Sequence, residues 1–181
     1  MSGCKVNNCE NHSSEVNQSI YIISLNVCGL KSKLFTPEFV ELCSKHDIIC
    51  LSEIKCDEVD MKNVVEFFEK MQFTVIYSVR KVVSAYKSGG IMIAVKHEMK
   101  PHWKPVRRRS EAFISLHLDK ACLNLMKDVV ITAVYIPPSN SRFSSIELFE
   151  ELDNFLLDYN DDDYYHIVCG DFNAHTGTYV K

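Results

Sequence analysis

The chain has 181 residues, of which 46% are hydrophobic and 24% are charged, and its formal net charge is −4 at pH 7. These values are typical of one globular domain that buries a sizeable core. They exclude a protein that holds DNA by overall charge, because such proteins are usually basic, so any contact with nucleic acid must be local. No apolar run approaches the roughly 20 residues of a membrane span.

The eight cysteines favour a reducing compartment. Cys50, Cys122 and Cys169 lie in apolar runs, where a free cysteine behaves as a small hydrophobic residue. There is no CxxC pair, and Cys4 and Cys9 lie in the polar N-terminal segment. We therefore expect an intracellular protein of the nucleus or cytoplasm that has no structural zinc site.

The first half of the chain alternates apolar runs with helical patterns. Residues 1–18 are polar and lack an apolar centre, so we expect a flexible leader rather than a secretory signal. Thr36-Pro37-Glu38 predicts a helix start, with Thr as N-cap and Pro at the first helical position, in a helix that runs to about residue 43. A second helix from Asp60 onward is predicted by apolar residues at helical spacing, namely Val64, Val65, Phe68 and Met71. Strands are expected at 20–25, 47–52 and 73–79.

The second half contains several strands in a row. They are expected at 91–95, after Gly89-Gly90, and at 111–118 and 129–136, which we interpret as a hairpin. Ser144-Ser145-Ile146-Glu147 has the pattern of a capping box that begins a third helix. The run 164–169 predicts a last strand, buried on both faces.

Adjacent strands beside helices indicate a mixed sheet system rather than a regular alternation of strand and helix. Two sheets packed face to face, with helices outside, would fit this order. We therefore expect the α+β class.

Several of the expected strands end in polar residues of similar chemistry. The first ends at Asn26, the second at Glu53, and the last at Asp171 and Asn173. If the last strand continues through Asn173, its two polar side chains point to the same side. Another strand ends near Tyr135. Carboxylate and amide oxygens suit Mg²⁺ or Mn²⁺, so these strand ends predict a metal site.

Each of these residues also has an ordinary structural explanation. Asn26 fits a turn, and Glu53 fits a helix start or a solvated charge. Tyr135 fits packing in a strand, and Asp171 with Asn173 fits a Gly-Asp turn. The recurrence of polar strand ends, rather than any single one, favours function.

Five ordered motifs carry a resemblance to a known family: Ser24-Leu25-Asn26-Val27-Cys28-Gly29-Leu30, Leu51-Ser52-Glu53-Ile54-Lys55, Ser88-Gly89-Gly90-Ile91-Met92-Ile93, Ala133-Val134-Tyr135-Ile136-Pro137-Pro138 and Gly170-Asp171-Phe172-Asn173-Ala174-His175-Thr176-Gly177. Together they resemble the endonuclease/exonuclease/phosphatase superfamily over residues 19–177. The last two motifs are most similar to endonuclease domains of non-LTR retrotransposons.

The resemblance implies a four-layer αββα sandwich that hydrolyses phosphodiesters with Mg²⁺ or Mn²⁺ and binds DNA. By motif, Glu53 would bind the metal, and Asn26 would help to hold the metal and the scissile phosphate. Tyr135 would contact the phosphate. Asp171 would deprotonate the attacking water, and Asn173 would orient Asp171 or the phosphate. These roles are consistent with the chemistry of phosphodiester hydrolysis. The metal would stabilise negative charge on the phosphate oxygens and the leaving group, while the carboxylate would generate the nucleophile from water.

The sequence departs from the family pattern at two places. Cys28 stands where the family usually has Asn or Asp, and the Ser-Asp-His segment that closes the family's site does not occur before Lys181. His175 lies inside the Asp171 motif, so it does not substitute for the closing histidine. We expect a domain at 19–181 that is incomplete at its C-terminus and an isolated chain that is weak or inactive. The alternatives are a non-catalytic remnant or interaction module, and a phosphatase of the same superfamily.

Two groups of basic residues lie between the motifs. Arg80, Lys81 and Lys87 form one group, and Arg107-Arg108-Arg109 forms the other. They would meet phosphates beside the site, or they are solvated loop charges. Three successive arginines in an acidic chain predict a local positive patch.

Overall fold

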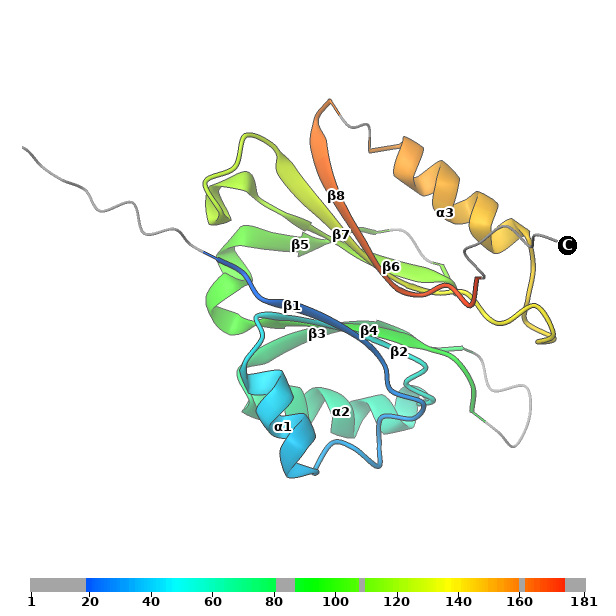
Figure 1. The fold of residues 1–181 in the computed structure, drawn as a ribbon. Coiled ribbons are helices and arrows are strands. Elements are labelled where there is room, and N and C mark those ends of the chain that lie inside the picture. Colours follow the sequence, from blue (N-terminus) through cyan, green and yellow to red (C-terminus); the bar gives the residue numbers. More distant parts are fainter. Residues whose placement is uncertain (1–18, 81–86, 108–109, 160–161, 175–181) are drawn as a thin grey trace, which may run out of the picture.

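The computed structural model describes residues 19–80, 87–107, 110–159 and 162–174, which form two four-stranded sheets packed face to face (Figure 1). The first sheet has the order β1-β2-β4-β3, with β1 (Ile22–Asn26), β2 (Ile48–Ser52), β3 (Phe73–Ser78) and β4 (Ile91–Lys96). The second has the order β5-β6-β7-β8, with β5 (Trp103–Pro105), β6 (Phe113–Leu118), β7 (Asp128–Tyr135) and β8 (Tyr164–Asp171).

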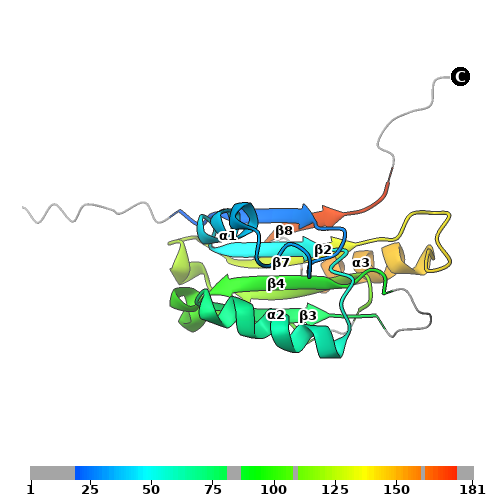
Figure 2. The ribbon, with the colours of Figure 1, turned by 90° about the horizontal axis from the view of Figure 1, so that it is seen from below.

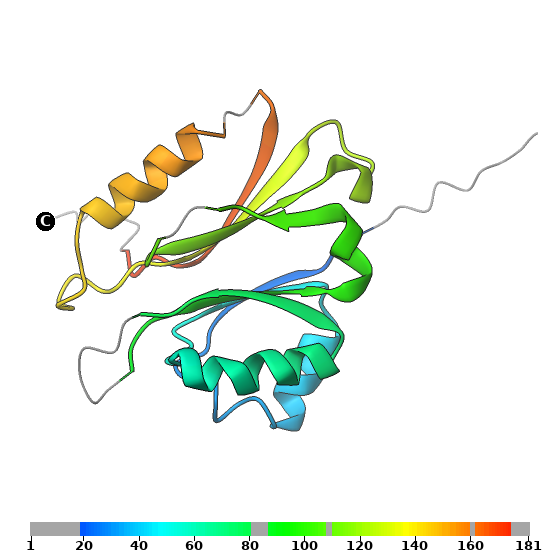
Figure 3. The ribbon, with the colours of Figure 1, turned by 180° about the vertical axis from the view of Figure 1, so that it is seen from behind.

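Helices cover both outer faces, which confirms the expected α+β sandwich (Figures 1 and 3). α1 (Pro37–Ser44) and α2 (Glu58–Lys70) lie on the first sheet, where Phe68 is buried in one core with Met92. α3 (Glu147–Leu157) lies on the second sheet and buries Phe155. Ile93 and Ile131 belong to the core between the sheets. None of the described helices is both long and apolar enough to cross a bilayer.

Strand pairing places the polar strand ends together. β1 pairs parallel with β2, so Asn26 lies beside Ser52, and β7 pairs parallel with β8, so Tyr135 lies beside Asp171. The other pairs are antiparallel. β1 and β8 form the same edge of their stacked sheets and contact each other (Figure 2). Because parallel strands end on the same side, four strand ends meet at one rim of the sandwich.

One strand expectation was wrong, and one strand was not expected. β8 is not buried on both faces, because it is the outer strand of its sheet and leaves 43% of Tyr165 and 38% of Ile167 exposed. β5 was not predicted at all. It has only three residues and includes Pro105, so it shows neither periodicity nor the usual strand composition.

The capping box expected at Ser144 is also wrong. α3 begins at Glu147 with Ile146 as a cap that makes no side-chain hydrogen bond, and Ser145 Oγ instead accepts from the Glu147 N–H at 3.2 Å. The first helix starts at Pro37 as expected, but the Thr36 hydroxyl donates to the Lys33 carbonyl rather than capping the helix. Both serine and threonine satisfy nearby backbone groups in a turn, which competes with capping.

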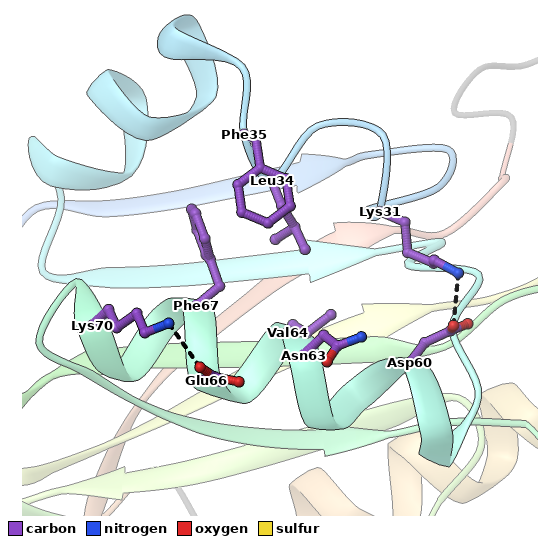
Figure 4. Close-up of a pocket in the computed structure, with 9 residues that line it drawn as sticks. All are labelled: Lys31, Leu34, Phe35, Asp60, Asn63, Val64, Glu66, Phe67 and Lys70. Carbon is purple, nitrogen blue, oxygen red and sulfur yellow. Dashed lines mark hydrogen bonds and ion pairs between the residues drawn. The ribbon is translucent and has the colours of Figure 1, made fainter.

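A capping box forms instead at the start of α2, three residues before the expected helix. The Asp57 carboxylate accepts from the Asp60 N–H at 2.9 Å, and the Asp60 carboxylate accepts from the Asp57 N–H at 3.3 Å. Asp60 also forms an ion pair with Lys87. A second ion pair, with Lys31 at 2.8 Å, lies beside a surface hollow of about 270 Å³ (Figure 4). Burial opposes ionisation of Asp60, but hydrogen bonds from the two lysines outweigh it and lower its pKa to about 2.

Asp60 is therefore expected to stabilise the fold by about 2 kcal/mol at neutral pH. Because its pKa in the folded protein lies below the ordinary value of 3.8, this stabilisation is complete above that value and disappears as the pH falls toward 2. Urea denaturation of wild type and Asp60→Asn between pH 6 and pH 3 should show a difference in unfolding free energy that narrows with acid. A difference in unfolding free energy that stays constant with pH would contradict this account.

Candidate active site

Two hydrogen bonds between side chains join the sheets at the rim. Asn26 Nδ2 donates to Asp171 Oδ2 at 2.6 Å, and the Tyr135 hydroxyl donates to Glu53 Oε1 at 2.7 Å. Asn26 and Glu53 come from the end of β1 and the residue after β2, while Tyr135 and Asp171 end β7 and β8. The fold thus gathers four of the predicted residues from four separate chain segments.

The fifth residue, Asn173, lies beyond the strand rather than on it. β8 ends at Asp171, and Asn173 has a φ of 45°, so the expected strand alternation does not reach it. Its backbone N–H donates to Asp171 Oδ1 at 3.0 Å, and its side-chain Nδ2 donates to the Ile136 carbonyl at 2.9 Å. Asn173 therefore orients the Asp171 carboxylate through its backbone, and its amide ties this turn to the end of β7.

Glu53 sits in a strained turn that glycines support. Its φ of 52° is in the left-handed region, which is uncommon for residues other than glycine. The next two backbone N–H groups donate to Gly90 O at 3.3 Å and to Gly89 O at 2.9 Å, and the Gly29 N–H donates to the Glu53 carbonyl at 2.8 Å. A Cβ on Gly90 would lie 2.8 Å from Ile54 Cγ1. Glycine at this position therefore lets the backbone of residue 90 lie close to Ile54. The turn aims Glu53 back toward Tyr135.

Lys55 is a neighbour of the site for which no sequence pattern predicted a role. Its Nζ lies 3.4 Å from Glu53 Oε2 and donates to Cys28 Sγ at 3.2 Å. Cys28, the departure from the family pattern, thus holds a lysine rather than supplying a carboxylate or amide. Glu53 and Lys55 are two positions apart in the Ser52-Glu53-Ile54-Lys55 motif, and both have a positive φ, of 52° and 50°.

Tyr135 is 4% exposed and remains a hydrogen-bond donor. Burial, followed by the hydrogen bond to Glu53, raises the pKa of its phenol. Neutral Tyr135 can therefore present its hydroxyl to the rim across the ordinary pH range.

Two of the basic residues, Arg80 and Lys87, do not form a phosphate-facing group. Arg80 is buried at 8% exposure, and Lys87 pairs with Asp57 and Asp60. Arg107 is exposed. The expectations for Lys81, Arg108, Arg109 and His175 fall outside the described residues.

The side chains at the rim fit a hard divalent cation. Among the described residues no three His, Cys, Asp or Glu side chains cluster, so the candidate set consists of two carboxylates, Glu53 and Asp171, and the Asn26 amide. Mg²⁺ is typically held by one or two carboxylates together with water and substrate phosphate. The Glu53 side chain is 20% exposed, so a hydrated ion can reach it. A carboxylate has about four lone-pair sites, so its bonds to Tyr135 and Lys55 leave acceptor capacity.

The sequence profile of the endonuclease/exonuclease/phosphatase family matches residues 23–179, which includes all five rim residues. The chain belongs to this family. No curated protein matches the sequence significantly. The profile thus confirms the superfamily indicated by the five motifs.

Solved structures of the endonuclease/exonuclease/phosphatase family share the fold. An AP endonuclease from Archaeoglobus fulgidus matches with a TM-score of 0.60 and 18% identity, over 86% of this chain and 58% of that one. The 3′ phosphatase NExo from Neisseria, bound to a product DNA hairpin, matches with a TM-score of 0.62 and 19% identity over the same shares. ANGEL2, a 2′,3′-cyclic phosphatase, matches with a TM-score of 0.57 and 15% identity, over 87% and 54%. The present chain thus spans little more than half the length of these proteins.

Proposed function

We propose that this chain belongs to a divalent-metal-dependent phosphodiester hydrolase that nicks DNA, in the manner of a retrotransposon endonuclease. The observation that supports this most directly is the pair of side-chain bonds, Asn26–Asp171 and Tyr135–Glu53, at one rim of the sandwich. The domain is proposed to span residues 19–181, after a leader of residues 1–18. The order Tyr135-Ile136-Pro137-Pro138 supports the retrotransposon type.

In this proposal each rim residue has a defined task. Glu53 and Asn26 hold Mg²⁺ or Mn²⁺, which when bound stabilises negative charge on the phosphate oxygens and the leaving group. Asp171, oriented by Asn26 and by the Asn173 N–H, accepts the proton of the attacking water. Tyr135 contacts the phosphate: its single O–H, which donates to Glu53 in this structure, turns to a phosphate oxygen when substrate is bound.

A plasmid-nicking assay with purified residues 1–181 tests this function. Because the chain covers little more than half of its structural neighbours, we expect weak nicking that requires Mg²⁺ or Mn²⁺. Asp171→Asn should lower the rate about 100-fold or more, since it removes the general base. Exposed Asp153→Asn on α3, the matched control, should nick like wild type.

The same preparation separates the proposed nuclease from a phosphatase. Two of the structural neighbours are phosphatases, so a phosphomonoester at a DNA 3′ end and a phosphoinositide are included as substrates. Turnover of either phosphomonoester without plasmid nicking would support the phosphatase. Strong nicking that Asp171→Asn leaves unchanged would refute the site assignment itself.

A further inference from the structure

Arg80 is a buried cation directly behind the rim. Only 8% of the residue is exposed, and its Nε has no hydrogen-bond partner among the described residues. The carboxylate oxygen Oε2 of Glu111 lies 3.8 Å from this Nε. A buried charge whose Nε lacks a hydrogen bond within the described part of the chain benefits from other compensation, because leaving water is costly for an ion.

Two aromatic rings supply that compensation. The guanidinium carbon lies 5.4 Å from the centre of the Tyr135 ring and 4.8 Å from the centre of the Phe143 ring. Both distances are within the range in which a cation is attracted to a ring face. Arg80 therefore lies between a rim residue and the loop that follows β7.

The space for the guanidinium depends on a glycine. A Cβ on Gly89 would lie 2.9 Å from Arg80 Nη1 and 3.0 Å from its Cζ. Gly89 also accepts the Lys55 N–H in the turn that carries Glu53. One short segment thus supports the Glu53 turn and makes room for Arg80.

We propose that Arg80 is a positioning residue that holds the Tyr135 ring by its face and, through the Tyr135 hydroxyl, fixes the orientation of Glu53. The ring plane determines where the hydroxyl points, and that hydroxyl donates to Glu53 Oε1 at 2.7 Å. Arg80 is too deeply buried to reach a phosphate itself, so it acts through Tyr135. The consequence for metal binding rests on the proposed function, whereas the positioning of the ring does not.

The first measurement uses metal-free protein. NMR of ¹³C-labelled tyrosine rings, with the Tyr135 signals assigned through Tyr135→Phe, should show shifted or broadened Tyr135 signals in Arg80→Lys and Arg80→Met. Arg107→Lys makes the same chemical change at an exposed position and should leave these signals unchanged. Unchanged Tyr135 signals in folded Arg80 variants would overturn the proposal. If the Arg80 variants do not fold, Phe143→Leu removes the far side of the stack, and it must then perturb Tyr135 for the proposal to stand.

The second measurement is Mn²⁺ affinity by electron paramagnetic resonance. Arg80→Lys keeps the charge but loses the planar stack, so we expect about tenfold weaker binding, as for other residues that orient a ligand. In a Tyr135→Phe background the same change should have no further effect. A different result would overturn the proposal: Arg80→Lys binds Mn²⁺ with wild-type affinity, and Arg80→Met binds it more tightly. Arg80 would then affect the metal only through its charge. If wild type itself binds no Mn²⁺, the proposed function fails, while the ring signals still decide the role of Arg80.

Discussion

Replacing Glu53 by glutamine is expected to weaken Mn²⁺ binding about 100-fold or more, with little loss of folding. Glutamine keeps the size of the side chain and an oxygen that can accept from Tyr135, but it removes the negative charge that a hard cation requires. Residues that merely orient a metal ligand often change affinity 10- to 100-fold, so a direct ligand should have at least this effect.

Isothermal titration with Mn²⁺ measures the effect of Glu53→Gln without relying on turnover. Glu41→Gln is the matched control, because Glu41 is an exposed glutamate on α1, on the outer face of the first sheet, where it pairs with Lys45 (Figure 1). The control should bind Mn²⁺ as wild type does. Equal affinity in Glu53→Gln and Glu41→Gln would remove Glu53 from the proposed ligand set.

Replacing Gly170 by alanine is expected to cause the largest loss of stability, about 3 kcal/mol or more. Gly170 has a φ of +141°, and a Cβ there would lie 2.0 Å from the Val134 carbonyl oxygen. The obstacle is backbone, which cannot rotate away as a side chain would. Relief requires β8 to move off β7, where Val134 and Gly170 are paired in register. Overpacking and a disfavoured φ each cost about 1–3 kcal/mol.

Gly29→Ala separates the two contributions to the loss of stability in Gly170→Ala, which are the disfavoured φ and the close contact with the Val134 backbone. Gly29 also has a positive φ, of +102°, but the nearest atom to an added Cβ is Lys55 Cδ at 4.0 Å. Gly29→Ala should therefore lose only the stability that the backbone conformation costs. Urea denaturation of both variants measures the difference. If Gly170→Ala is no less stable than Gly29→Ala, the close contact with Val134 does not constrain the protein.

The strand ends could be predicted because they depend on local sequence. Apolar runs closed by Asn26, Glu53 and Asp171 are visible within six or seven residues, and family motifs add their order along the chain. The position of β8 at the edge could not be predicted in this way. Its run of apolar residues is equally consistent with a central strand, since strand order is decided by contacts between distant segments.

Two details of the rim depend on backbone conformation that no local pattern reveals. The left-handed conformation of Asn173 turns its amide toward Ile136 rather than along the strand direction. The burial of Arg80 requires Gly89, Tyr135 and Phe143 to meet from three separate segments. A basic residue in a polar stretch is ordinarily solvated, so the sequence alone favoured the wrong environment.

Each of the two bonds across the rim has one partner in each sheet. The distance between the partners of each bond is therefore set by the thickness of the apolar layer that separates the sheets, in which Ile93 faces the same core as Ile131. Protein interiors are close-packed and resist compression, so this layer acts as a spacer of fixed width. Changes in side-chain volume deep in the sandwich would then alter the spacing of the rim residues without touching any residue there.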